Sequence, residues 1–297
     1  MTARRTTRLL LATLALTLLA LTGCGSPPSD GSNGSNGSQG SKGSKGSKGS
    51  KGSKGSSSAR PGLGDPVLKD IALQLVSSAE NSSLDWKAQY KYIEDIGDGR
   101  GYTGGVIGFC SGCGDMLKVV ERYTRARPGN PLEPFTGALR AAGGGDSHEG
   151  LGTPFTEAWV RAAGDPEFRA AQDAERDRAY FDPALAQAER DGLGALGQFI
   201  YFDARVMHGQ GDTKGTVGFR TMRARAIAKA EPPSQGGDEK AYLAAFLDVR
   251  VAAIDWEPSH SDTSRIESAQ RIFLNEGKFG LERPLRWTVY GDSYRID

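Results

Sequence analysis

Two carboxyl side chains, Glu80 and Asp98, lie 18 residues apart in settings that could present them to a ligand. Glu80 follows a run of apolar residues at helical spacing, and partial burial at the end of that helix would favour its protonated form and suit it to act as a general acid. Asp98 lies within residues 97–101 (GDGRG), where glycines let the backbone approach a ligand. Two carboxylates facing each other across a cleft are the minimum requirement for cleaving a glycosidic bond.

A second group with chemical potential is the C-x-x-C pair Cys110 and Cys113. It could be a redox pair, half of a zinc site, a structural disulfide or two incidental thiols. Asp115 follows directly and would oppose the stabilisation of a thiolate. No second C-x-x-C or nearby histidine pair completes a zinc site in the sequence. We therefore expect a structural disulfide or incidental thiols, with no metal and no cofactor.

The elements that must position these groups are mostly helices. Asp65-Pro66 is a helix-start signal, and apolar spacing predicts a helix over 66–81 that ends near Glu80. Residues 86–109 are rich in glycine and tyrosine and predict a small β-sheet with tight turns. Helical periodicity then predicts further helices over 116–125, 155–163, 166–179, 183–191, 193–207, 218–229, 238–254 and 263–275.

These elements predict an α+β fold that is mostly α-helical and has two lobes, one small sheet and a cleft between the lobes. We place the first lobe at residues 61–140 plus the C-terminal tail, and the second at 145–280. Residues 193–207 are apolar on most faces, so we expect them to form a central buried helix that connects the lobes.

The N-terminal residues have the pattern of an export signal. Three arginines precede an apolar run of 13 residues from Leu9 to Leu21, which is shorter than the roughly 20 residues that a membrane-spanning helix needs. The run leads into Leu-Thr-Gly and Cys24, which resembles a bacterial lipobox. We expect a lipoprotein signal peptide over 1–24, lipidation of Cys24 and an extracellular protein anchored to the outer face of the membrane, with the export route left open between the general and the twin-arginine pathway.

Residues 25–60 follow as a low-complexity segment of Gly-Ser-X triplets in which X changes from Asn and Gln to Lys. Such a segment cannot bury apolar surface, so we expect a flexible tether before a domain over 61–297. Residues 1–60 hold nine basic residues and one acidic residue, which leaves residues 61–297 with 28 and 35, a net charge of −7. An acidic domain argues against nucleic-acid binding and favours a cationic partner.

Longer motifs resemble a known family. Residues 77–83 (SSAENSS) and 90–105 (YKYIEDIGDGRGYTGG) resemble the active-site region of the bacterial chitosanases of glycoside hydrolase family 46. The similarity covers essentially all of residues 62–297, and it continues through residues 108–112 (GFCSG), 150–156 (GLGTPFT), 175–178 (ERDR), 235–239 (QGGDE) and 262–265 (DTSR).

The resemblance implies a lysozyme-like fold and endo-hydrolysis of β-1,4 bonds in chitosan with inversion of the anomeric carbon. By the same resemblance, Glu80 corresponds to the general acid, Asp98 to the general base, and Thr103 to a hydroxyl that helps to hold the attacking water. Four further cleft positions are implied to bind substrate, together with Arg100 beside the acidic pair: Tyr92, Asp115, Glu257 and His260. A charge network behind Glu80 is also implied: Asp203, Arg250 and Arg265.

Other functions stay open on the sequence alone. A peptidoglycan hydrolase of the muramidase type could use the same fold, and a lipoprotein could bind chitosan without cleaving it. A thiol-redox lipoprotein could be built on Cys110 and Cys113. For the preferred interpretation we expect chitosan as the partner, membrane contact only through Cys24, and a monomer.

Overall fold

The computed structural model describes residues 61–213, 215–257 and 262–297. The predicted signal peptide, Cys24, the tether and His260 lie outside these residues. Within the described ranges, no helix combines the length and the apolar character that crossing a bilayer requires.

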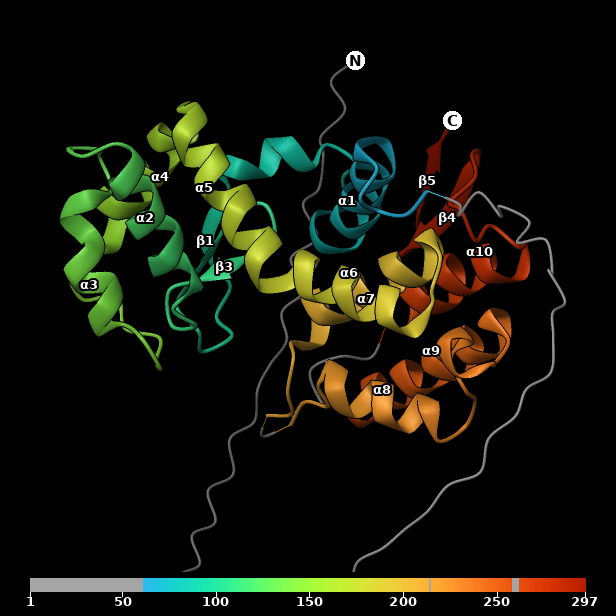
Figure 1. Cartoon of the computed structure of the whole chain (residues 1–297). Coiled ribbons are helices and arrows are strands. Elements are labelled where there is room, and N and C mark those ends of the chain that lie inside the picture. The colour runs from blue at the N-terminus through green and yellow to red at the C-terminus, as the bar shows by residue number, and fades with distance from the viewer. Residues whose placement is uncertain (1–60, 214, 258–261) are drawn as a thin grey trace, which may run out of the picture. The chain divides into compact units, whose positions relative to one another are not determined.

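The described part is predominantly helical, with two small antiparallel sheets (Figure 1). The α-helices are α1 (Pro66–Asn81), α2 (Asp115–Ala126), α3 (Thr136–Ala141), α4 (Gly152–Ala162), α5 (Pro166–Arg176), α6 (Asp182–Asp191), α7 (Ala195–His208), α8 (Phe219–Ile227), α9 (Glu239–Trp256) and α10 (Arg271–Asn275). The strands are β1 (Ile93–Asp95), β2 (Tyr102–Gly104), β3 (Phe109–Cys110), β4 (Leu285–Val289) and β5 (Asp292–Ile296). The predicted α+β class is confirmed.

Local signals set the limits of α1. The Asp65 side chain accepts hydrogen bonds from the backbone N–H groups of Val67 (2.9 Å) and Leu68 (3.1 Å), and Pro66 takes the first helical position. The helix ends at Asn81, before Ser82 in the left-handed conformation (φ 48°). Glu80 therefore lies in the last turn, as predicted.

The predicted sheet over 86–109 is also present. Strands β1, β2 and β3 pair antiparallel in that order, with Thr103 opposite Glu94 on one side and Cys110 on the other. The β1–β2 loop carries Gly97, Gly99 and Gly101, whose φ angles are 71°, 78° and 72°. Glycine adopts this left-handed conformation without steric cost, so the alternate glycines determine the path of the loop that carries Asp98.

The hydrophobic core consists of two clusters, and they divide the chain differently from the predicted lobes. The smaller cluster joins the β1–β3 sheet with α2–α5, and the larger joins α1, α6–α10 and the β4–β5 hairpin (Figure 1). The predicted first lobe, residues 61–140 plus the C-terminal tail, was therefore wrong in grouping α1 with α2 and α3, and right in grouping α1 with the C-terminal tail. Helix α1 belongs with the C-terminal half because its buried face packs there, and Trp287 Nε1 donates to Ser78 Oγ at 3.0 Å.

A different helix from the predicted one links the clusters. Helix α7 is buried along most of its length, as predicted, but its core side chains all belong to the larger cluster. The link is the continuous helical segment 166–191, in which α5, a π-helical turn over Asp177–Phe181 and α6 follow one another. Phe168 lies in the smaller cluster and Phe181 in the larger. Segment 166–191 is long enough for its first turns to pack in one cluster and its last turns in the other, whereas the buried side chains of α7 pack in one cluster only.

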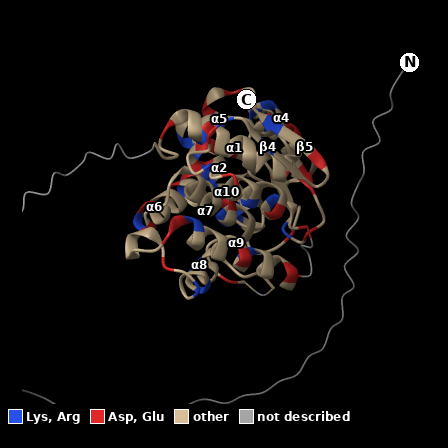
Figure 2. Ribbon diagram, turned by 90° about the vertical axis from the view of Figure 1, so that its right-hand side faces the viewer, with Lys and Arg blue, Asp and Glu red and all other residues tan. Residues whose placement is uncertain are grey.

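The β4–β5 hairpin was missed in the sequence, where only one sheet was predicted. Its signal was present, because Leu285, Trp287 and Val289 alternate with less buried residues and are themselves buried. Figures 1 and 2 both place β4 beside α1. The hairpin therefore supports the helix that carries Glu80.

Candidate active site

Glu80 is held at the end of α1 by a buried cation. The Glu80 side chain is 30% exposed, and its Oε1 accepts a hydrogen bond from Arg265 Nη2 at 2.7 Å. The same Nη2 donates to Asp203 Oδ1 at 2.8 Å. Arg265 is only 5% exposed, so its guanidinium is fixed from behind and orients the carboxylate in front of it.

Asp203 lies at the centre of this charge network. Its Oδ2 accepts from Arg250 Nη1 (3.0 Å) and from Gln270 Nε2 (2.6 Å), and Arg250 Nη1 also donates to Gln270 Oε1 (2.8 Å). Burial of Asp203 would raise its pKa, but Arg265 and Arg250 outweigh that effect and lower the pKa. With Glu80 included, two carboxylates balance two guanidiniums, which is the condition for burying such charges at all.

The network residues come from three separate helical segments. Asp203 lies on α7, Arg250 lies on α9, and Arg265 directly precedes the π-helical turn Ile266–Gln270. The structure thus brings together the three residues that the resemblance had grouped. Gln270 was missed, because nothing in its local sequence separates it from any other helical glutamine.

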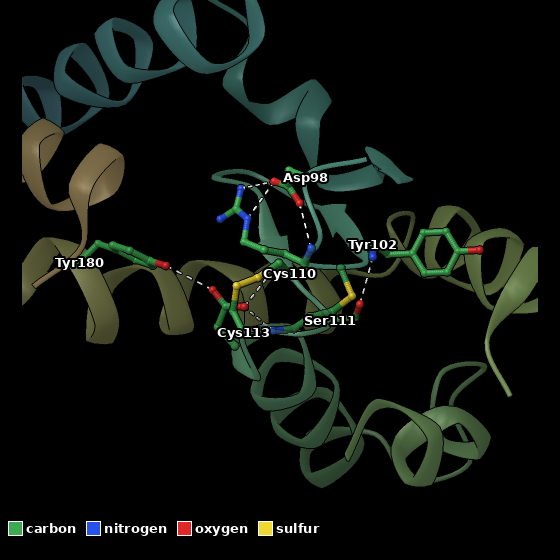
Figure 3. The surroundings of a disulfide bond; sticks show 9 residues. Asp98, Tyr102, Cys110, Ser111, Cys113 and Tyr180 are labelled. Atoms are coloured by element: carbon green, nitrogen blue, oxygen red, sulfur yellow. Dashed lines mark hydrogen bonds and ion pairs between the residues drawn. A yellow bond between two sulfur atoms is a disulfide. The ribbon is translucent and has the colours of Figure 1, made fainter. Parts of the chain in front are cut away.

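Asp98 lies in the β1–β2 loop and binds Arg100 with both oxygens (Figure 3). Its Oδ2 accepts from Arg100 Nε (2.8 Å) and Nη2 (2.5 Å), and its Oδ1 accepts from the Arg100 backbone N–H (3.0 Å). The Asp98 side chain is 27% exposed and that of Arg100 is 54% exposed. Asp98 is therefore oriented and still reachable by water, which a general base requires.

Thr103 follows on strand β2 and has an unusual feature. Its hydroxyl is buried, yet Oγ1 has no hydrogen-bond partner among the described residues. A buried hydroxyl without a partner costs about 1–3 kcal/mol, so it is rare without a reason. A hydroxyl in this state can bind a water molecule or a substrate group.

Tyr92 lies on the Asp98 side, just before β1. Its hydroxyl donates to Glu94 Oε2 at 3.4 Å. Burial raises the pKa of Tyr92, and the negative charges of Glu94 and Asp98 raise it further. Tyr92 therefore lies next to the strand that leads into the loop carrying Asp98.

Cys110 and Cys113 form a disulfide beside Asp115 (Figure 3). The structural-disulfide interpretation is confirmed, and the sulfur atoms are not free thiolates. Asp115 Oδ1 accepts from the N–H groups of Cys110 and Met116, both at 2.8 Å, and Oδ2 accepts from Tyr180 OH at 3.2 Å. Burial of Asp115 raises its pKa. Its carboxylate thus holds the start of α2, and its substrate role stays a prediction.

The disulfide-closed turn also fixes the base of the loop that carries Asp98. Gly112 N–H donates to Arg100 O (2.9 Å), and Ser111 N–H donates to Tyr102 O (2.8 Å) while Ser111 Oγ accepts from Tyr102 N–H (3.0 Å). A Cβ atom at Gly101 would collide with Ser111 Oγ, so only glycine fits there. Ser111 was not singled out in the sequence, since its partner becomes adjacent only through strand pairing.

Glu257 lies at the C-terminal end of α9. It caps the C-terminus of α9 and is buried, with Oε1 lying 3.4 Å from His208 Nδ1 and accepting from Val217 N–H at 3.3 Å. The backbone at the helix end turns its carboxylate into the protein, and its substrate role stays a prediction. His260 lies outside the described residues.

The acidic charge of the domain is not gathered into a single face. In the view of Figure 2, acidic and basic residues are interspersed over the helices and loops. The net charge of residues 61–297 therefore acts as a diffuse attraction for a cationic partner.

Comparisons with known proteins place the chain in a family. The model of glycosyl hydrolase family 46 matches residues 74–285. A chitosanase from Streptomyces sp. (strain N174) is 59% identical over 239 residues, covering 80% of this chain and 85% of that protein. The solved structure of chitosanase OU01 with substrate is 59% identical with a TM-score of 0.76, covering 80% of this chain and 99% of that one.

A more distant structure is similar in the same way. A chitosanase from Gynuella sunshinyii in complex with chitotetraose is 36% identical with a TM-score of 0.69, covering 77% of this chain and 97% of that one. These matches confirm the expected lysozyme-like α+β fold class and the resemblance that the motifs indicated.

Proposed function

Because the chain belongs to glycosyl hydrolase family 46, we propose that it is an endo-acting chitosanase that hydrolyses β-1,4-glycosidic bonds with inversion of the anomeric carbon. The observation that carries the proposal is the pair of oriented carboxyl groups. Glu80 is held by Arg265 in front of the buried Asp203, and Asp98 is held by Arg100 on a glycine-rich loop. The similar proteins named chitosanases, some solved with substrate, support the choice of polymer.

Each residue has a defined task in this reaction. Glu80 takes up a proton from solvent before each turnover and gives it to the glycosidic oxygen as the bond from that oxygen to the anomeric carbon breaks. Asp98 takes a proton from a water molecule whose oxygen forms the new bond on the opposite face of the sugar ring. The unpartnered hydroxyl of Thr103 offers that water a hydrogen bond. The products are a new reducing end of inverted configuration and a free hydroxyl.

The charge network supplies the orientation that this reaction needs. A general acid must point at one oxygen atom, and a displacement of about 1 Å can cost a factor of 100 in rate. Arg265 is fixed by Asp203, so Glu80 is held by a group that has little freedom of its own. On the other side, Arg100 and Tyr92 surround Asp98 and are our candidates for substrate contact, with Asp115 supporting their loop.

Time-resolved NMR of a fully deacetylated glucosamine oligomer tests substrate, reaction and stereochemistry together. We expect the α-anomer to appear first, and Glu80→Gln and Asp98→Asn to lower kcat by about 100- to 10,000-fold. Asp248→Asn is the matched control, because it removes a carboxylate that is 58% exposed and pairs with Arg271, and leaves the hydrogen bonds of Glu80 and Asp98 in place. An initial β-anomer would exclude inversion, and normal turnover by Glu80→Gln would show that the acid is misassigned.

Assays of the wild-type protein on other substrates distinguish the alternative functions. Release of reducing ends from cell walls but not from chitosan would establish a muramidase. Tight binding of chitosan without any cleavage would establish a binding protein. A thiol-redox protein would act on a disulfide substrate, and this activity would vanish in the variant with both Cys110 and Cys113 changed to Ser.

We also propose that the enzyme is exported and anchored through a lipid on Cys24, which lies outside the described residues. The support is the lipobox-like sequence after the apolar run. Mass spectrometry of the mature N-terminal peptide from the full chain should show an acylated Cys24. An unmodified N-terminus at another residue would refute anchoring without affecting the proposed reaction.

A further inference from the structure

A strained aromatic residue forms the tip of the C-terminal hairpin. In the β4–β5 register Val289 pairs with Asp292, so Tyr290 and Gly291 form a two-residue turn, with φ angles of 53° and 87°. Positive φ at both positions is the pattern of a type I′ turn, which favours asparagine, aspartate or glycine at its first position. A tyrosine there costs about 1–2 kcal/mol, and such strain often marks a functional side chain.

The hairpin tip is fixed to the residues around Glu80. The backbone N–H of Tyr290 donates to Ser264 Oγ at 2.9 Å, and Ser264 directly precedes Arg265, the residue that binds Glu80. At its base the hairpin is attached to α1 through Trp287 and Ser78. The tip therefore keeps a constant position relative to the last turn of α1.

The side chain of Tyr290 is only partly buried. The residue is 47% exposed. Burial raises the pKa of Tyr290, Arg265 opposes this effect, and the charges of Glu80 and Asp262 add to it. The ring thus has an open side and lies within the electric field of Glu80 and Asp262.

An aromatic ring in this position suits an amino sugar. The apolar face of a pyranose packs against aromatic rings, and an ammonium group is attracted to the ring face by cation–π interaction. The neighbouring carboxylate of Asp262 adds attraction for a positive charge. Arg265 does not compete, because its guanidinium is buried and bound to Glu80 and Asp203.

We propose that the ring of Tyr290 contacts a glucosamine unit bound next to Glu80 and favours a free amino group on that unit. Tyr290 is then a specificity-determining residue on the side of the site that carries Glu80, whereas Tyr92 lies on the side that carries Asp98. This inference rests on the proposed action on chitosan, and it explains why a tyrosine occupies a turn position that asparagine would fill with less strain.

The decisive experiment measures binding in the Glu80→Gln background, where the oligomer is not consumed. Isothermal titration with a fully deacetylated glucosamine hexamer should show affinity roughly 3- to 30-fold weaker for Tyr290→Asn and unchanged within about twofold for Tyr290→Phe, which keeps the ring. A partly N-acetylated hexamer should lose less affinity in Tyr290→Asn. Val160→Asn, which removes an exposed apolar side chain on α4, is the control and should bind like its parent.

The choice of asparagine separates binding from folding. Asparagine fits the first position of a type I′ turn, so Tyr290→Asn should unfold at the same temperature as its parent or higher. Equal affinity of Tyr290→Asn and its parent would overturn the inference even if wild-type protein cleaves chitosan. Conversely, a ring-dependent affinity in a protein that leaves chitosan intact would refute the proposed function and retain Tyr290 as a binding residue.

Discussion

Replacing Asp203 by asparagine is the most direct test of the buried charge network. Asparagine keeps the size of the side chain and removes its negative charge. Arg250 is fully buried and Arg265 is nearly so, and only Glu80 would remain to balance their two positive charges. Removing one partner of a buried ion pair costs about 3–5 kcal/mol, a large fraction of the roughly 5–15 kcal/mol that stabilises a folded domain.

This cost converts into a measurable change in melting temperature. For domains of about 150–250 residues, 1 kcal/mol shifts the midpoint by roughly 2–4 °C, so Asp203→Asn should melt about 6–20 °C below wild type. The control Asp248→Asn breaks an ion pair in which Asp248 is 58% exposed. An exposed pair contributes about 0–1 kcal/mol, so this control should stay within roughly 4 °C of wild type. Differential scanning calorimetry at neutral pH measures both.

The pH dependence follows from the lowered pKa of Asp203. Burial would raise this pKa, but Arg265 and Arg250 lower it below the value of about 4 for an unfolded aspartate. A depressed pKa means that the stabilisation is fully present above about pH 4 and is lost as the pH falls through the folded-state value. The gap between wild type and Asp203→Asn should therefore be constant above about pH 5 and shrink in stronger acid.

Two results would refute this reasoning. The first is a melting temperature for Asp203→Asn as high as that of the Asp248→Asn control, which would mean that Asp203 does not neutralise the buried guanidiniums. The second is a gap that grows as the pH falls below about 4, because it would require an Asp203 pKa above the unfolded value. Activity measured well below the melting temperature should also fall at least about tenfold, since Arg265 would no longer be fixed behind Glu80.

Three further predictions concern the base side of the site. Thr103→Val should lower kcat by about 100-fold and leave the melting temperature unchanged or slightly higher. The reason is that it removes a buried hydroxyl that has no partner in the described part of the chain. If the melting temperature and kcat fall together, Thr103 has a structural role instead. Gly101→Ala should lower the melting temperature of the protein more than Gly129→Ala does, as measured by calorimetry. Both glycines have positive φ (72° and 77°), but only at Gly101 does the added Cβ meet other atoms. Equal decreases in melting temperature would show that Ser111 moves aside at little cost. Changing both Cys110 and Cys113 to Ser should lower the free energy of unfolding by about 2 kcal/mol, the value for so short a closed loop. The variant should still hydrolyse chitosan, measured as the release of reducing ends. Complete loss of hydrolysis in a folded variant would show that the disulfide is essential to the reaction.

The family resemblance implied the fold class and the grouping of Asp203, Arg250 and Arg265; the other features that the sequence predicted correctly are local ones. The start and end of α1 follow from Asp65-Pro66 and the apolar spacing, and these signals are sufficient to place Glu80 in the last turn of the helix. The loop around Asp98 follows from its alternate glycines. Cap hydrogen bonds and φ preferences involve residues only a few positions apart, and their energies barely depend on the rest of the fold.

The long-range features depended on tertiary structure. The sequence showed residues 193–207 as buried, but only packing decided that they stay within one cluster and that the amphipathic segment 166–191 links the two. The turn of Glu257 into the protein toward His208, the bond between Asp115 and Tyr180, and the approach of Tyr290 to Arg265 each join residues far apart in sequence. Periodicity reports which face of an element is buried, whereas the identity of its partner depends on how all the elements pack at once.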